Sequence, residues 1–447
     1  MASEVLVRNV MTFRRWAATA GLLTLAVTAT ACSSSGSSAA GKSTAGTASK
    51  PITLTYWTSS SQAEINWIDS HFNSSHSTIK VQGQYIASAD DTPAKEVSAL
   101  KTNTEPNVVI GQDPSELPLL EESGKIVNLA SALSAEDSTL YPGIKSALFY
   151  QGQQLGMALG GVGDYVLFYN KTDFAKAGIS GPPTTWAQLE QDAIKLSDPA
   201  KHQYGIYIPW GTDEWISYDW ESLLWANGGQ FLNSSNSSVA FDSPAGVAAL
   251  TTWVDLVRKD HAAPTTSFAE AGSYDGAPAF SDNDVAMIID GQWAVSEFQT
   301  AKVSFGAALV PAGLSGHSAA NIGIGVATVF NQGGSSAVAA ATSFVQWLAQ
   351  PAQGAYLTSV SGGLPSAPDQ LTQPLVKTEA ATSPFYQVFA NQLGTGETRP
   401  TVPAYSAISL DLATEIQDAL NGTVTPAQAL ATAASEGNQA IASGSGS

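Results

Sequence analysis

The sequence has a single cysteine, Cys32, among its 447 residues. One thiol cannot form an internal disulfide, so the fold must be held together by its hydrophobic core alone. Basic residues are also scarce, because 19 Lys and Arg stand against 38 Asp and Glu and the net charge is −19. A strongly acidic surface disfavours nucleic acids and anionic lipids, so we expect neither as a partner.

Motifs of enzymes and metal sites are missing as well. The 5 histidines show no metal-ligand spacing, and neither a P-loop nor a Gly-x-Ser-x-Gly elbow occurs. Gly323-Ile324-Gly325 is a lone G-x-G, which is weak as a nucleotide-binding loop. We therefore predict no catalytic residues, no metal and no cofactor.

The apolar stretch near the start of the chain is short. It covers residues 21–27, follows Arg14 and Arg15, and precedes the small residues 29–31. It is too short and too rich in threonine to cross a membrane. A basic patch, a short apolar stretch and small residues before a cleavage point mark a signal peptide, which we predict over residues 1–31.

Cys32 directly follows Ala-Thr-Ala, an arrangement that resembles the bacterial lipobox, in which cysteine becomes lipid-modified and is the first mature residue. The sequence departs from that motif at Ala29, where leucine is usual. Acyl chains contribute about 0.8 kcal/mol per buried CH₂, so a multiply acylated cysteine anchors a protein well. Residues 33–50 are almost only Ser, Ala, Gly and Thr. We therefore predict a lipid anchor with a flexible tether over residues 32–50.

From residue 51 onward the chain has the composition of a globular protein, and about 400 residues exceed one ordinary core, which predicts two lobes. Strand and helix patterns alternate. Strands are predicted over 52–57, 79–86 and 107–111, and helices over 63–73 and 93–102. This alternation is typical of α/β folds, whose ligands bind beyond the carboxyl ends of the strands.

That rule points to residues that follow two of the predicted strands. Trp57 and Thr58 end the first strand, and Gln112 and Asp113 follow the third. The Asp113 carboxylate can accept hydrogen bonds from ligand hydroxyls. An N-cap or turn role ahead of Pro114 is an equal alternative for this aspartate.

A series of short motifs occurs in a fixed order along the chain. They are residues 53–57, residues 105–109 with Asn107 where Asp is usual, and residues 167–174, 183–186, 285–293, 362–365 and 399–400. This ordered set resembles the extracellular solute-binding proteins of carbohydrate ABC importers, the family of the maltose-binding protein. The resemblance covers nearly the whole mature chain, with a departure at Ala158, where the family often has proline.

The resemblance implies a two-lobed periplasmic-binding-protein fold of type II, each lobe a mixed sheet flanked by helices, with the ligand in a cleft between them. Lobe one is predicted over 51–158 and 300–360, and lobe two over 159–299 and 361–447. Gly160-Gly161-Val162-Gly163 lies near the first crossover, where glycines would permit the backbone rotations of a hinge, although an ordinary loop is an alternative.

The same resemblance implies the function and the partners. We expect a monomeric sugar-binding protein that is lipid-anchored at the cell surface and delivers its ligand to the permease subunits of an ABC transporter.

Tryptophans indicate the kind of ligand. A helix is expected from about Thr212, with Trp220 on its apolar face as a core residue. Trp210 and Trp215 are then candidates for a cleft wall, and Trp293 resembles the site tryptophan of the family. Flat aromatic faces with a few placed polar groups suit the apolar faces and hydroxyl edges of sugars.

Polar candidates complete the predicted site. Asp164 and Tyr165 lie at the lobe boundary, and Arg399 is an isolated arginine for which a structural ion pair is the favoured alternative. The predicted ligand contacts are Trp57, Thr58, Gln112, Asp113, Asp164, Tyr165, Trp210, Trp215, Trp293, Gly325 and Arg399.

Two other functions stay open. A secreted carbohydrate-active enzyme, such as a glycoside hydrolase, needs two carboxylates about 5–10 Å apart. Candidates for such a pair are Asp113, Asp164, Asp213 and Asp219. The same fold could instead bind a non-sugar solute such as a polyamine, a peptide or a metal complex, but the aromatic content favours a sugar.

Overall fold

The first of two main sheets has the strand order β2-β1-β3-β11-β6. The computed structural model describes residues 50–86, 92–265 and 276–444, so the predicted signal peptide, Cys32 and most of the tether lie outside the described residues. The strands of this sheet are β1 (Ile52–Thr58), β2 (Ile79–Tyr85), β3 (Val108–Gln112), β6 (Met157–Ala158) and β11 (Val326–Val329). Because β1 is parallel to β2 and β3 while β11 is antiparallel to β3 and β6, the sheet is mixed.

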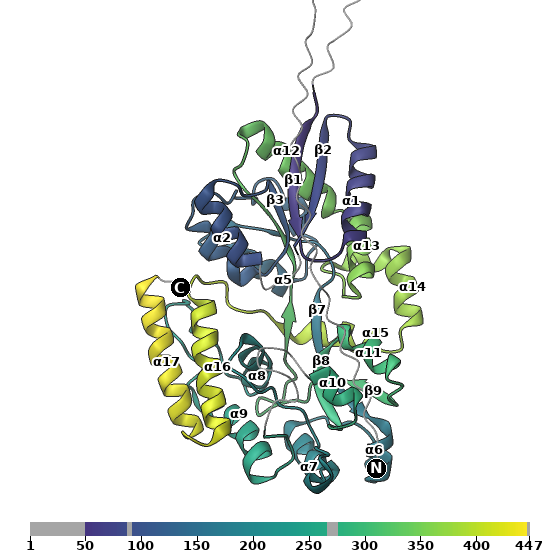
Figure 1. The fold of residues 1–447 in the computed structure, drawn as a ribbon, viewed down its shortest axis with the longest axis vertical. Helices are drawn as coiled ribbons and strands as arrows, with labels where there is room; N and C mark the ends of the chain where they lie inside the picture. Colours follow the sequence, from purple (N-terminus) through teal and green to yellow (C-terminus); the bar gives the residue numbers. More distant parts are fainter. Residues whose placement is uncertain (1–49, 87–91, 266–275, 445–447) are drawn as a thin grey trace, which may run out of the picture. The chain divides into compact units, whose positions relative to one another are not determined.

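Helices cover both faces of the first sheet (Figure 1). They include α1 (Gln62–Ser75), α2 (Thr92–Thr102) and α12 (Ser335–Leu348). Successive side chains of a strand point to opposite faces, so Tyr56 joins the large core on the α1 and α12 side while Trp57 packs near Ala99 of α2. The strands and helices predicted over residues 52–111 are thus all present, with ends within two residues of those expected.

The second sheet has the order β12-β10-β7-β8, and β9 also pairs with β7. Its strands are β7 (Gly163–Asn170), β8 (Met287–Gly291), β9 (Phe305–Ala308), β10 (Ala320–Gly323) and β12 (Gly396–Glu397). Residues 204–208 lie beside β8 but form no regular strand. They make one bridge, Tyr204 to Val285, and the Tyr207 N–H donates to the Met287 carbonyl at 2.9 Å.

Helices of the second half pack mainly on one another. Helices α8 (Glu214–Ala226), α9 (Pro244–Val254), α16 (Tyr405–Asn421) and α17 (Pro426–Ser443) form one group. Their inward residues build a second core around Trp220 and Ile408. The other helices are α3 (Leu117–Glu121), α4 (Ser134–Asp137), α5 (Pro142–Ala147), α6 (Lys171–Lys176), α7 (Trp186–Leu196), α10 (Gly276–Ser281), α11 (Val295–Thr300), α13 (Pro351–Ser361), α14 (Pro374–Thr382) and α15 (Tyr386–Gln392).

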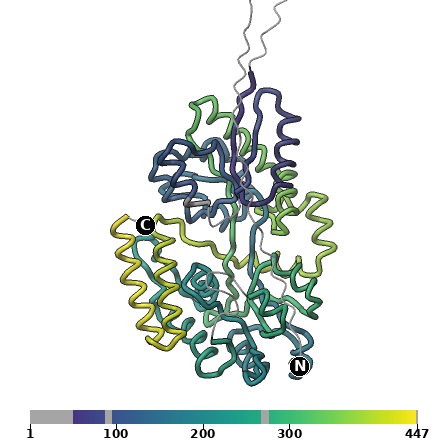
Figure 2. Tube along the Cα trace, in the orientation of Figure 1, coloured from purple at the N-terminus to yellow at the C-terminus, as the bar shows by residue number. Residues whose placement is uncertain are grey.

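The chain passes between the two sheets three times: from β6 to β7, from β10 to β11, and between β11 and β12. Figure 2 shows the chain trace along which these passages lie. The first passage agrees with the expected change of lobe after residue 158. The second lies between Gly323 and Val326, because β9 and β10 belong to the second sheet. A lobe boundary at residue 300 therefore falls before two strands of that sheet.

The first passage is packed against the segment near Leu364. Val162 and Leu364 exchange backbone hydrogen bonds of 2.8 Å, and the Gly161 N–H donates to the Leu364 carbonyl at 3.0 Å. Gly161 has φ +78°, and an added Cβ would lie 2.4 Å from the Ser361 hydroxyl. Glycine is required there by conformation and by space. Its role as a hinge stays a prediction.

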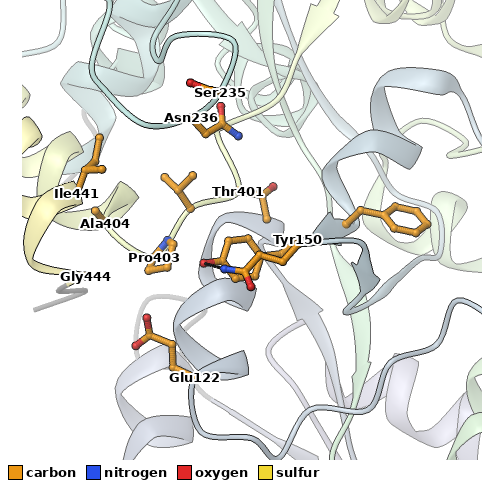
Figure 3. A pocket seen from close by; sticks show the side chains of 12 residues that line it. Glu122, Tyr150, Ser235, Asn236, Thr401, Pro403, Ala404, Ile441 and Gly444 are labelled. Carbon is orange, nitrogen blue, oxygen red and sulfur yellow. Dashed lines mark hydrogen bonds between the residues drawn. The ribbon is translucent and has the colours of Figure 1, made fainter.

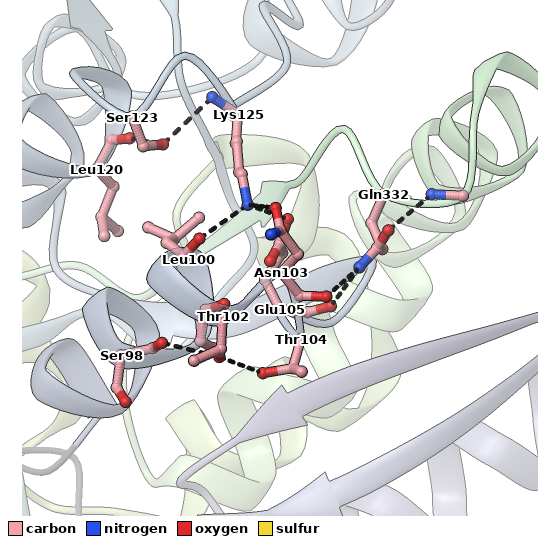
Figure 4. A network of polar contacts seen from close by, with 12 residues as sticks. Ser98, Leu100, Thr102, Asn103, Thr104, Glu105, Leu120, Ser123, Lys125 and Gln332 are labelled. Carbon is pink, nitrogen blue, oxygen red and sulfur yellow. Dashed lines mark hydrogen bonds and ion pairs between the residues drawn. The ribbon is translucent and has the colours of Figure 1, made fainter.

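A polar network ties the segment after α2 to the ends of two other elements (Figure 4). The Lys125 ammonium donates to the Leu100 carbonyl and pairs with the buried Glu105 carboxylate, each at 2.9 Å. The Gln332 amide reaches the backbone carbonyls of Asn103 and Glu105 at 3.5 and 3.4 Å. Because Lys125 neutralises a buried carboxylate, we assign this network to stability rather than to ligand binding.

The helices described in residues 50–86, 92–265 and 276–444 include none that is both long enough and apolar enough to span a membrane.

Candidate functional site

The first residue of α8 is fixed by Asp213, whose side chain accepts a hydrogen bond from the Trp215 N–H at 3.1 Å. An aspartate N-cap of this kind satisfies a backbone donor that the first helical turn leaves open. Trp215 and Tyr218 are three residues apart and therefore share one side of the helix. Their ring centroids lie 5.8 Å apart, with the planes at 82°.

The aromatic contacts continue from α8 onto the second sheet. The Tyr165 ring on β7 lies 5.3 Å from that of Tyr218 and 5.7 Å from that of Trp293. The four residues Trp215, Tyr218, Tyr165 and Trp293 form a continuous series, which we call the aromatic row. Both tyrosines are buried, whereas Trp215 is 38% and Trp293 45% exposed. The row thus presents a tryptophan to solvent at each end.

The indole of Trp293 lies against backbone that has no side chains. A Cβ added to Gly291 would be 2.2 Å from the indole, and one added to Gly163 would be 3.1 Å from it. The neighbouring Gln292 holds this corner in place, because its amide accepts from the Asp164 N–H and donates to the Val162 carbonyl, each at 3.0 Å. The two glycines let one face of the indole rest on the sheet, and the exposed remainder is available to a ligand.

Arg399 connects both halves of the molecule at the aromatic row. Its guanidinium pairs with Asp113, which follows β3, at 3.1 Å and with Glu214 of α8 at 2.9 Å. It also lies over the Tyr218 ring, 4.6 Å from the centroid, in a cation–π contact. Burial would lower the pKa of Arg399, but the carboxylates of Asp113 and Glu214 outweigh it and raise that pKa.

A second layer of carboxyl groups lies behind Arg399. The Tyr405 hydroxyl lies 3.2 Å from both the Glu214 and the Glu221 carboxylates. Glu221 is also bonded by the Asn321 amide at 2.6 Å. Burial raises the pKa of Glu221 to about 8, and burial together with the Asp113 charge raises the pKa of Glu116 to about 8. At neutral pH these two groups are therefore largely protonated.

Two further carboxyl groups are buried below the aromatic row. Desolvation raises the pKa of Asp164 on β7 and that of Asp219 on α8 well above the ordinary value, against the lowering effects of the Tyr165 backbone and side chain respectively. The nearby charge of Asp290 on β8 raises the pKa of Asp219 further. Burial thus favours the neutral form of both carboxyl groups.

Several predicted contacts are buried in structural roles. Trp57 is 8% exposed, donates to the Gln84 amide at 3.1 Å and has the Lys95 ammonium 4.3 Å from its ring centroid. Thr58 is buried beside Glu64. Gln112 is buried and donates to Glu96 at 2.5 Å. Other side chains of the protein therefore cover these three residues. Trp57 and Gln112 pack against α2, and Thr58 packs against Glu64 of α1.

The remaining predictions are placed as follows. Asp113 has the predicted N-cap role, because its side chain accepts from the Ser115 N–H at 2.9 Å at the start of the 3₁₀ turn η1 (Pro114–Glu116). Its carboxylate also pairs with Arg399 at the candidate site. Trp210 is half-buried against the second core. At Gly325 the backbone comes close to Gly111, because an added Cβ would lie 3.4 Å from the Gly111 Cα.

The structure brings together Asp113, Tyr165, Trp215, Trp293 and Arg399 from the predicted set. Sequence reasoning missed four residues of the site: Glu116, Tyr218, Glu214 and Tyr405. Tyr218 had a detectable signal in its i+3 spacing from Trp215. Glu214 and Tyr405 had none, because their contact joins residues 191 positions apart.

A series of hollows leads from Arg399 along residues 398–404. The first is too narrow to hold a water molecule and is lined by Asp113, Ile322 and Arg399 among others. The next, about 320 Å³, shares Arg399 and Thr398 with it. A third, about 450 Å³, is lined by Tyr150 and Glu122 on one side and by Asn236 and Ile441 on the other (Figure 3). This third hollow contains neither exposed tryptophan of the row, and we place the site at the row because the row combines open aromatic faces with placed charges.

Within the described part of the chain, no three His, Cys, Asp or Glu side chains are grouped so that they could hold a metal ion.

Comparison with known proteins adds relatives of both sequence and structure. A putative binding protein of Brucella abortus is 27% identical over 153 residues, which is 34% of this chain and 36% of that protein. The match thus spans little more than a third of that relative. The sn-glycerol-3-phosphate-binding periplasmic protein UgpB of Rhizobium meliloti is 24% identical, over 70% of this chain and 74% of its own.

Solved structures show the same architecture. The cyclic alpha-maltosyl-1,6-maltose binding protein from Arthrobacter globiformis superposes with a TM-score of 0.78 and 25% identity, covering 88% of this chain and 99% of that one. The predicted fold, two lobes of mixed sheets flanked by helices, is thereby confirmed. Residues 67–383, more than half of the chain, match the family of bacterial extracellular solute-binding proteins. The chain belongs to that family of binding proteins.

Proposed function

We propose that this protein binds a sugar at the aromatic row and delivers it to the permease subunits of an ABC importer. The observation that carries the proposal is the indole of Trp293, which is 45% exposed and rests on Gly291 and Gly163. An aromatic face held in this way suits the apolar C–H face of a sugar ring, and hydroxyl groups at the ring edge need polar partners close by.

Polar groups that can bond to sugar hydroxyls lie around Arg399. The carboxylates of Asp113 and Glu214 accept hydrogen bonds, and a hydroxyl group can both donate and accept. The sugar named for the Arthrobacter globiformis protein supports an oligosaccharide as ligand. The hollows that continue from Arg399 past Thr401 would give room for further sugar units.

We propose further that the protein has no enzymatic activity. A glycoside hydrolase needs one carboxyl group as acid and another as base or nucleophile. Asp113 and Glu214 are instead held by one guanidinium, and Asp164 and Asp219 are buried under aromatic rings. Incubation with oligosaccharides should release no reducing ends, and steady release that Asp113→Asn abolishes would favour the enzyme.

The membrane anchor is a separate part of the proposal. Family membership supports a position outside the cytoplasmic membrane, and Cys32 after a signal-like segment supports a lipid anchor there. Cys32→Ser should therefore move the protein from the membrane fraction to the soluble fraction or the medium. A variant that fractionates with the membrane as the unchanged protein does would exclude this anchor.

The ligand itself is best sought by thermal shift with a library of mono- and oligosaccharides. A ligand that binds only the folded chain stabilises it by RT ln(1 + [L]/Kd), about 2.7 kcal/mol at a hundredfold excess over Kd. We expect a rise in Tm with at least one sugar and a clearly smaller rise with the same sugar in Trp293→Ala. If a polyamine or peptide raises Tm and no sugar does, the ligand is not a sugar and the proposal is wrong.

A further inference from the structure

We infer that this site selects by charge: it takes an uncharged, hydroxyl-rich solute and rejects solutes that carry a phosphate group. The inference rests on the aromatic row being the binding site, as proposed above. It separates two ligand classes that the relatives leave open, since one is named for a neutral sugar and another for sn-glycerol 3-phosphate.

Phosphate is commonly recognised by a cation that is free to bind it, usually an arginine whose N–H groups face the oxygens. The cation placed at the aromatic row is Arg399. One of its terminal nitrogens is 3.1 Å from Asp113 and the other 2.9 Å from Glu214. Its guanidinium carbon lies over the Tyr218 ring, 4.6 Å from the centroid. A phosphate would have to displace at least one carboxylate that is already paired.

The charges around Arg399 also oppose an anion. One positive guanidinium stands against two carboxylates, Asp113 and Glu214, which leaves one negative charge. Glu116 and Glu221 lie behind them and are buried. Where they ionise, the site becomes more negative still. Like charges brought into such a site cost several kcal/mol of binding free energy.

Hydrogen-bond chemistry gives the same answer independently of net charge. The exposed Glu214 carboxylate and the Asp113 carboxylate are acceptors only. A sugar hydroxyl can donate to them, whereas the phosphate group of a phosphomonoester dianion has only acceptor oxygens. The site therefore complements hydroxyl groups and faces phosphate with acceptor against acceptor.

The test is calorimetric titration of the mature chain with sn-glycerol 3-phosphate and with inorganic phosphate at pH 7.5. We expect no binding of either at millimolar concentration. The double variant Asp113→Asn and Glu214→Gln keeps the side-chain shapes and frees Arg399, so it should bind inorganic phosphate at least tenfold more tightly than the unchanged protein. Asp198→Asn removes a carboxylate from an exposed ion pair with Lys201 instead and is the matched control.

Binding of sn-glycerol 3-phosphate by the unchanged protein would overturn the inference. So would a double variant that folds, as judged by its melting curve, and still ignores phosphate, because the paired carboxylates would then not be the cause. Failure of the sugar library with a protein that also rejects phosphate would instead count against the proposed function and leave the charge selectivity standing.

Discussion

At the scale of single residues, Trp293 and Trp220 differ in what covers their rings. Trp293 is 45% exposed and lies on two glycines, whereas Trp220 is fully buried in the second core. Removing an exposed ring costs little packing, while removing a buried one leaves a cavity. The two tryptophans should therefore separate affinity from stability.

We expect Trp293→Ala to lose affinity for the bound sugar and to keep its melting temperature. A ring stacked on a sugar buries roughly 60–80 Å², worth about 1.5–2 kcal/mol at about 25 cal/mol per Å². Such a loss weakens binding about tenfold or more. Calorimetric titration gives the affinity, and a melting curve of the same sample gives the stability.

Two further variants sharpen this experiment. Trp220→Ala should cost about 3–5 kcal/mol of folding free energy, as large-to-small core substitutions do. Gly291→Ala should weaken sugar binding although it removes no contact, because the new Cβ would lie 2.2 Å from the Trp293 indole and displace it. If Trp293→Ala unfolds early and its folded fraction binds normally, Trp293 is a core residue and not a contact.

The sequence allowed single site residues to be predicted where a local pattern marked them. Trp293 is the tryptophan of the segment Gly291-Gln292-Trp293, and Trp215 lies off the apolar face of its helix. Both side chains are exposed, as expected for a cleft wall. The burial of Trp57 could not be predicted from its own strand, because its environment depends on α2, which contributes Ala99 to the cluster around it. The Arg399–Tyr218 contact joins residues far apart in sequence, and no local pattern encodes it.

At the scale of elements, the junction of α2, β3 and η1 holds two buried carboxyl groups. Glu96 of α2 accepts from the Gln112 amide at 2.5 Å, and Glu116 lies in η1. Burial and the charge of Glu116 raise the pKa of Glu96 from 4.5 to about 9, and burial first of all raises that of Glu116 to about 8. At neutral pH the folded chain therefore keeps protons on these two carboxyl groups that the unfolded chain has released.

A pH dependence follows from these raised pKa values. Between pH 4.5 and about 9 the folded chain binds more protons at Glu96 than the unfolded chain, so the free energy of unfolding falls as pH rises through this range. Glu96→Gln removes the titration and should flatten the curve. We expect the loss of stability between pH 5 and pH 8 to shrink by at least about 1.4 kcal/mol, the equivalent of one pKa unit.

Denaturant unfolding at several pH values measures this effect. Glu122→Gln changes an exposed carboxyl group that follows Glu116 closely in the sequence, and it is the control. Its free energy of unfolding should change with pH as that of the unchanged protein does. Equal slopes for Glu96→Gln and the unchanged protein would mean that Glu96 is ionised in the folded chain.

The elements themselves were largely predictable where hydrophobic periodicity was strong. Alternating and helical patterns placed β1, α1, β2, α2 and β3. Pairing across the sheet was not predictable, because the antiparallel placement of β11 beside β3 depends on a segment more than 200 residues away. For the same reason the second passage between the sheets lies after β10, where no composition change marks it.

At the scale of the whole molecule, Arg399 links the two lobes through ion pairs. Asp113 follows a strand of the first sheet, and Glu214 begins a helix packed on the second. A ligand that donates hydrogen bonds to both carboxylates contacts both lobes at once. The passages at Gly161 and near Gly323 are where the chain connects the sheets, and closure of lobes around a ligand is a known motion of two-lobed binding proteins.

We therefore expect a saturating sugar to reduce the radius of gyration in small-angle scattering. A compact chain of about 400 residues has a radius of gyration of roughly 21 Å, and an open two-lobed chain exceeds that value. Closing the lobes brings mass toward the centre, so the measured radius should fall toward the compact value. Trp293→Ala is the control, at a sugar concentration that fills the unchanged protein but lies below the Kd of the variant, and it should stay open because it binds little sugar there. An unchanged scattering curve for the unchanged protein, with binding proven by calorimetry on the same sample, would mean that the site is rigid and that the glycines at 160–163 form an ordinary loop.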